Sequence, residues 1–155
     1  MKIVMDSRLI HLYQKMLLIP LDPRSENMRP NLRVPANEKQ DINIIKALYK
    51  IKISGARFCK LPSNEGELKE YIKADKDLPE CCVKGFDIQK INQRTNELND
   101  PYEDLGEECK LLAEAEECGA NIILTTNPNF ITNLSNKAIN VRILKPSDYS
   151  KETNA

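Results

Sequence analysis

The feature that most constrains the fold is a pair of short apolar runs, one near each end of the chain, that both lead into polar residues. The first, residues 2–6 (KIVMD), ends on Asp6, and the second, residues 121–125 (NIILT), leads to Asn127. Runs that are apolar throughout are typical of parallel strands buried on both faces. Helical patterns lie between them, so we predict an α/β fold, a three-layer sandwich with a central parallel sheet of four or five strands.

The remaining predicted elements complete this alternation. Two further strands are expected over residues 56–61 and 139–144, and the second alternates apolar and polar residues as an edge strand does. Helices are predicted over residues 7–19, 37–52, 64–74, 87–99 and 104–118. We expect a single domain over residues 1–146, followed by a polar tail over residues 147–155.

Composition limits the function classes. A length of 155 residues suits one domain, and 41% hydrophobic with 30% charged residues describes a soluble globular protein. A formal net charge of zero argues against a generally basic nucleic-acid coat but allows a local site. We expect no signal peptide, because the first apolar run is too short, and no membrane span. The five cysteines lack a C-x-x-C spacing, so free thiols in a reducing cytoplasm are predicted.

The predicted helix over residues 104–118 sorts its carboxylates by helical periodicity. One stripe is charged throughout and is interpreted as solvated: Glu107, Lys110, Glu114 and Glu117. A second stripe is apolar with one exception: Leu105, Glu108, Leu112 and Ala115. A carboxylate on a buried face costs several kcal/mol unless it is paired or binds a cation. Glu108 is therefore a candidate functional residue.

Two further residues can share a site with it. Asp6 and Asn127 follow strands whose carboxyl ends meet at one edge of a parallel sheet, where ligands bind. Carboxylate and amide oxygens are ligands suited to Mg²⁺ or Mn²⁺. Asp6 has a structural alternative, since it can cap the helix that follows it. Glu67 borders the apolar face of its helix, and its residues alone favour a capping box with Asn64.

The proline-rich segment over residues 20–37 is modestly basic. It carries Arg24, Arg29 and Arg33 against two acidic residues. Long loops in compact domains often serve a function. The segment is interpreted either as a solvated surface loop or as an arm that contacts phosphate groups. The one histidine, His11, has no partner at metal-ligand spacing and is interpreted as structural.

Three segments together resemble one known family. KIVMDS is similar to a strand–Asp–Ser/Thr signature, and EECKLLAEAEECGANIILTTNPNF to an acid–helix–Gly–strand–Thr-x-Asp/Asn-x-x-Phe pattern. NVRILKPSDY looks like the usual closing strand and proline. Their order and spacing resemble the PIN-domain family, the metal-dependent ribonuclease fold of many bacterial and archaeal toxins. The resemblance covers most of the chain, although its first and last thirds carry it.

The resemblance implies cleavage of single-stranded RNA by water activated at one or two Mg²⁺ or Mn²⁺ ions. Asp6, Glu67 and Glu108 would hold the metal, and Asn127 would complete the catalytic set. Ser7 and Thr125 would support the site, and four arginines would contact RNA: Arg8, Arg24, Arg29 and Arg33. A cytoplasmic homodimer, paired with an antitoxin protein, is also implied.

Two positions depart from the family pattern. Arg8 stands where asparagine is common, and Asn127 is neutral where the family often has aspartate. They motivate an alternative function, in which a catalytically weak or inactive PIN-fold module binds RNA or a protein partner. A third interpretation is another Mg²⁺-dependent phosphohydrolase on an α/β sheet.

Overall fold

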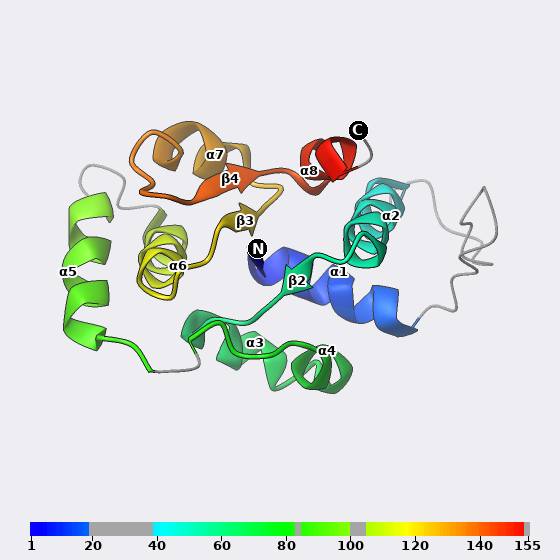
Figure 1. The fold of residues 1–155 in the computed structure, drawn as a ribbon, viewed down its shortest axis with the longest axis horizontal. Coiled ribbons are helices and arrows are strands. Elements are labelled where there is room, and N and C mark those ends of the chain that lie inside the picture. The colour runs from blue at the N-terminus through cyan, green and yellow to red at the C-terminus, as the bar shows by residue number, and fades with distance from the viewer. Residues whose placement is uncertain (19–38, 83–84, 100–104, 154–155) are drawn as a thin grey trace.

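The computed structural model describes residues 1–18, 39–82, 85–99 and 105–153, and its centre is a parallel sheet (Figure 1). In the described part of the chain four strands follow the order β2-β1-β3-β4. They are β1 (Lys2–Met5), β2 (Arg57–Phe58), β3 (Ile122–Leu124) and β4 (Arg142–Leu144). All three strand pairs are parallel. The predicted α/β fold with a central parallel sheet is confirmed, and β4 is an edge strand as expected.

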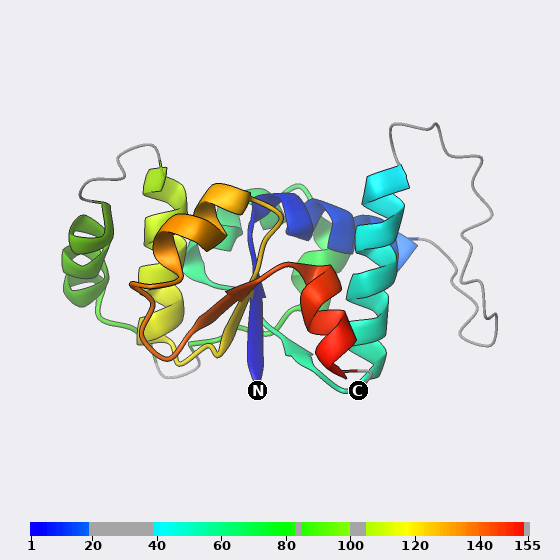
Figure 2. The ribbon, with the colours of Figure 1, turned by 90° about the horizontal axis from the view of Figure 1, so that it is seen from above.

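Helices cover both faces of this sheet (Figure 2). On one face lie α1 (Ser7–Leu18), α2 (Lys39–Ile53), α4 (Ile72–Asp77) and α8 (Pro146–Thr153). On the other lie α6 (Gly106–Glu117) and α7 (Pro128–Leu134), and α5 (Ile88–Asn99) packs outside α6. Alternate residues of each strand serve the two cores: Ile3 and Met5 point to the first, and Val4 points to the second. Buried strands that serve two cores are apolar throughout, which explains the KIVM run.

Two predicted boundaries are corrected by the structure. The single helix expected over residues 64–74 is a 3₁₀ turn, η2 (Pro62–Asn64), then α3 (Glu65–Leu68) and α4, with Tyr71 outside helical geometry between the last two. The polar tail expected after residue 146 is instead α8 up to Thr153. Tyr149 of α8 is only 9% exposed and packs in the same core as α1 and α2. One aromatic residue therefore docks an otherwise polar helix.

The prediction of free thiols is wrong for four of the five cysteines. Cys59 is bonded to Cys81, and Cys82 to Cys118. The chain after β2 runs beside residues 79–81, because Lys60 N donates to the Pro79 carbonyl at 2.8 Å. This pairing brings the Cα atoms of Cys59 and Cys81 to 5.1 Å. The Cα atoms of Cys82 and Cys118 are 5.0 Å apart, and both distances are within disulfide range.

The fifth cysteine, Cys109, is buried and takes part in neither disulfide. Disulfides are more usual in oxidising compartments than in the cytoplasm. The cytoplasmic location stays a prediction. Within the described residues, no helix has the length and apolar character that crossing a membrane would need.

Candidate functional site

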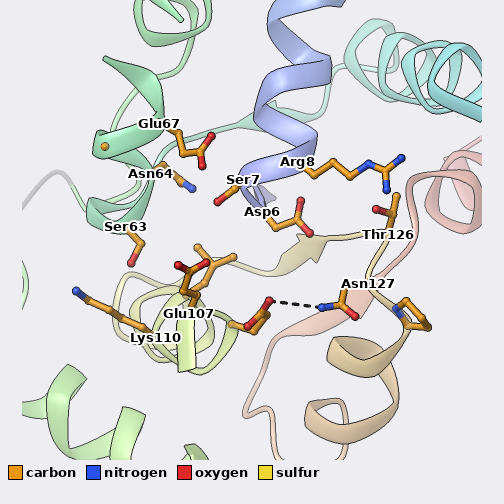
Figure 3. A pocket seen from close by; sticks show the side chains of 14 residues that line it. Asp6, Ser7, Arg8, Ser63, Asn64, Glu67, Glu107, Lys110, Thr126 and Asn127 are labelled. Carbon is orange, nitrogen blue, oxygen red and sulfur yellow. Dashed lines mark hydrogen bonds between the residues drawn. The ribbon is translucent and has the colours of Figure 1, made fainter. Parts of the chain in front are cut away.

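A pocket of about 720 Å³ opens at the sheet edge where β1 and β3 end (Figure 3). It brings together four residues singled out in the sequence: Asp6, Glu67, Glu108 and Asn127. They come from four separate segments: the end of β1, α3, the first turn of α6 and the turn after β3. The edge of the sheet predicted from strand direction is therefore the place where these side chains meet.

Asp6 both caps a helix and lies in the site, the two roles that its position in the sequence allowed. Its Oδ1 accepts a hydrogen bond from Leu9 N at 3.0 Å, which caps α1, while the residue also lines the pocket. Its Oδ2 accepts from the Thr125 hydroxyl at 2.5 Å. Burial raises the pKa of Asp6, and the charge of Glu108 raises it further. The two hydrogen bonds and the charge of Arg8 oppose this rise without cancelling it.

Asn127 contacts Glu108 through its amide nitrogen. Its Nδ2 lies 3.4 Å from Glu108 Oε1, and its Oδ1 accepts from Asn129 N at 3.0 Å to cap α7. The oxygen is therefore used by the helix, and the side that faces Glu108 is a donor. In this arrangement the Asn127 amide nitrogen is placed to orient Glu108.

Thr125 connects Asp6 to the turn that carries Asn127. It is fully buried, and its hydroxyl donates to Asp6 and accepts from Asn127 N at 3.0 Å. Ser7 lines the pocket, and the Glu67 side chain points towards it from α3 (Figure 3). Glu67 is half-buried, so its carboxylate can reach both solvent and the pocket.

Arg8 stands at the rim of the pocket. Its guanidinium lies 3.1 Å from Asp41 of α2, and its side chain is 57% exposed. The three other arginines expected to contact RNA, Arg24, Arg29 and Arg33, lie outside the described residues. A second cation, Lys110 of α6, lies across the pocket from Arg8 (Figure 3).

Periodicity misassigned one carboxylate of α6. Glu107 and Lys110 are exposed as expected, although both also line the pocket. Glu114, expected on the same solvated stripe, is 1% exposed. Its Oε1 accepts from Ser63 N at 2.8 Å and its Oε2 from the Ser63 hydroxyl at 2.6 Å. Helix α6 is packed by α5 on one side and by η2 on another, and every residue from 111 to 115 is buried.

Only one signal in the sequence pointed to this burial. The segment 111–115 reads LLAEA, so every residue from three before Glu114 to one after it, apart from Glu114 itself, is apolar. A helix covered on two sides does not keep the simple division into a wet face and a dry face.

The pocket suits a hard divalent cation in its chemistry, since four carboxylates line it and three of them are the predicted ligands. The carboxylates are not gathered at ligand spacing. Among the described residues, no group of three or more histidine, cysteine, aspartate or glutamate side chains is arranged to hold a metal ion. Metal binding would require the carboxylates of Asp6, Glu67 and Glu108 to approach one another more closely.

Comparison with known proteins adds no relative: no family model, no curated protein and no solved structure matches the chain.

Proposed function

We propose that the chain is a divalent-metal-dependent ribonuclease of the PIN type, which cleaves single-stranded RNA in the pocket at the sheet edge. The observation that carries the proposal is the state of Asp6. It shares a pocket with Glu67 and Glu108, and burial together with the Glu108 charge raises its pKa. A carboxylate held in this way is stabilised by a cation, so the pocket favours Mg²⁺ or Mn²⁺.

The residues of the pocket have distinct roles in this proposal. Asp6, Glu67 and Glu108 would hold the ion, which supplies an activated water and neutralises phosphate charge. Thr125 and the amide of Leu9 fix the orientation of Asp6, and Asn127 orients Glu108.

The rim would bind the rest of the substrate. Arg8 and Lys110 offer cationic contacts on opposite sides of the pocket for the neighbouring phosphates of an RNA strand. Both side chains are exposed, so a strand lying over the pocket can reach them. Substitution of either should weaken binding and reduce its salt dependence.

The test is Mn²⁺-dependent cleavage of a labelled single-stranded RNA by the wild type and by Asp6→Asn. We expect the substitution to lower cleavage by about 100-fold or more, because loss of even an indirect metal partner costs about 10- to 100-fold. Asp75→Asn is the matched control, since Asp75 is an ion-paired aspartate that does not line the pocket. Equal cleavage by the wild type and Asp6→Asn would remove the mechanism.

A second candidate function is a non-catalytic module that binds RNA or a protein partner. The contact from the Asn127 amide to Glu108 favours it, because that donor occupies the place where a family aspartate would add charge. This function predicts RNA binding without metal-dependent cleavage. A filter-binding assay run beside the cleavage assay separates the two.

Three associated proposals need their own measurements. The antitoxin partner would be a small protein that blocks the pocket, and the homodimer would appear in light scattering. A different phosphohydrolase activity would appear as metal-dependent release of phosphate from small phosphate esters.

A further inference from the structure

The proposed ligands leave one buried carboxylate of α6 without a role. Glu114 is 1% exposed, and both of its oxygens accept hydrogen bonds from one residue, Ser63. A buried carboxylate is costly unless it is hydrogen-bonded, so this contact needs both of its partners. Ser63 belongs to η2, and η2 forms one wall of the pocket together with α3. Glu114 is therefore attached to the pocket wall from outside the pocket.

The same wall is held at two further points. Asn64 is 3% exposed, and its Nδ2 donates to the Met5 carbonyl at 3.2 Å, one residue before Asp6. Its Oδ1 accepts from Leu61 N at 2.9 Å. Leu68, at the end of α3, is 2% exposed and packs in the core beneath α1. The short segment that carries Glu67 is thus anchored to α6, to β1 and to the core.

We propose that Glu114 is a positioning residue that sets the place of Glu67 relative to Asp6 and Glu108. Helix α6 carries Glu108 in its first turn and Glu114 in a later turn. One rigid helix therefore supplies one proposed ligand directly and holds the segment bearing another through Ser63. The inference rests on the proposed metal site, and it adds a residue that touches neither metal nor substrate.

The test compares Mn²⁺ affinity, measured by calorimetry, among variants that remain folded at the assay temperature. Glu114→Ala removes both hydrogen bonds, and we expect the affinity to fall on the order of 10-fold. Glu114→Gln should retain most of the affinity. The glutamine carbonyl can accept from Ser63 N, and its amide can donate to the Ser63 hydroxyl. Ser63→Ala keeps the backbone bond and should fall between these two.

Glu116→Ala is the matched control. Glu116 lies two residues further along α6, with an 11% exposed side chain, and it pairs with Arg94 at 2.8 Å on the side away from the pocket. Its loss should lower the melting temperature while leaving Mn²⁺ affinity unchanged. Cleavage of single-stranded RNA should follow the same order as Mn²⁺ affinity across the whole series.

Each outcome decides the inference. Wild-type affinity in both Glu114→Ala and Ser63→Ala would show a purely structural role and overturn it. A Glu114→Gln variant as weak as Glu114→Ala would assign the effect to charge, which also overturns it. If Glu114→Ala does not fold, a loss in Ser63→Ala with retention in Glu114→Gln supports it. A wild type that neither binds Mn²⁺ nor cleaves RNA would instead remove the proposed function, and this inference with it.

Discussion

Asp6 and Asp77 each accept a hydrogen bond from a hydroxyl group, yet their pKa values move in opposite directions. Asp77 is bonded by the Tyr13 hydroxyl and by Lys52 Nζ, the latter at 2.6 Å. Burial alone would raise the pKa of Asp77, but the Lys52 and Tyr13 bonds and the Lys52 charge lower it overall. For Asp6, burial prevails and the pKa rises.

The opposite pKa shifts of Asp6 and Asp77 depend on whether a cationic side chain of the protein bonds directly to the carboxylate. Lys52 completes the Asp77 cluster and joins α2 to α1 and α4. Arg8 has the smallest of the effects on Asp6, and its guanidinium is bonded to Asp41. A carboxylate paired within the chain stabilises the fold, whereas one left beside a second carboxylate is suited to an external cation. This contrast is the physical basis of the proposed metal site.

The largest expected effect concerns covalent restraint, in which the two regions also differ. Cys59 comes shortly before the pocket wall in sequence and is bonded to Cys81. Among the described residues, the core around Tyr13 contains no cysteine, whereas the core on the other face of the sheet contains both members of that pair. Reduction should lower the free energy of unfolding by about 3 kcal/mol for each disulfide, measured by urea denaturation with and without dithiothreitol. An unchanged midpoint would show that the cysteines are thiols, as their spacing first indicated.

The second effect tests the cation-paired cluster. Tyr13 is fully buried, and Tyr13→Phe removes a hydroxyl that donates to Asp77 and accepts from Lys52. We expect a loss of about 2 kcal/mol in the free energy of unfolding, because hydrogen bonds to charged groups are the stronger ones. Tyr71→Phe is the control: its hydroxyl contacts His11 at 3.0 Å in a half-exposed position and should cost about 1 kcal/mol or less. Equal losses of stability in Tyr13→Phe and Tyr71→Phe would show that the hydrogen bonds of Tyr13 to charged groups add no extra stability.

The smallest expected effect gives the most decisive test, because the stability changes of Asp6→Asn and Asp77→Asn at pH 7 should have opposite signs. The folded pKa of Asp6 is raised above its ordinary value of 3.8, so the metal-free fold loses stability as the pH rises from 3.8 through that raised pKa. Asp6→Asn should therefore increase stability at pH 7 and have little effect below about pH 3.8.

Asp77 should behave in the opposite way. Its folded pKa is lowered, so its stabilisation is full above pH 3.8 and is lost as the pH falls through the folded pKa. Asp77→Asn should decrease stability at pH 7 by about 1 kcal/mol or less, since the ion pair is partly exposed. Urea denaturation between pH 3 and pH 8 checks both variants. Changes of the same sign at pH 7 would refute the contrast.

Strand direction predicted where the site lies, and helical periodicity predicted that Glu108 belongs to it. Asp6 and Asn127 were placed at one sheet edge because they follow parallel strands, and both line the pocket. The contact between Asn127 and Glu108 could not be predicted, because the Asn127 oxygen is taken by the cap of α7. Which atom of an amide faces a neighbour depends on hydrogen bonds formed after the chain folds.

The sequence by itself determined the alternation of strands and helices, because apolar runs and helical periods are local patterns. Only the tertiary structure decided which faces of a helix are covered. Glu114 is buried because η2 packs on the side of α6 that periodicity left to solvent, where Ser63 donates to both of its oxygens. The disulfides were decided in the same way, since bonding depends on distances between Cα atoms that are 22 and 36 residues apart in the chain. Packing between distant segments sets both, and no local pattern records it.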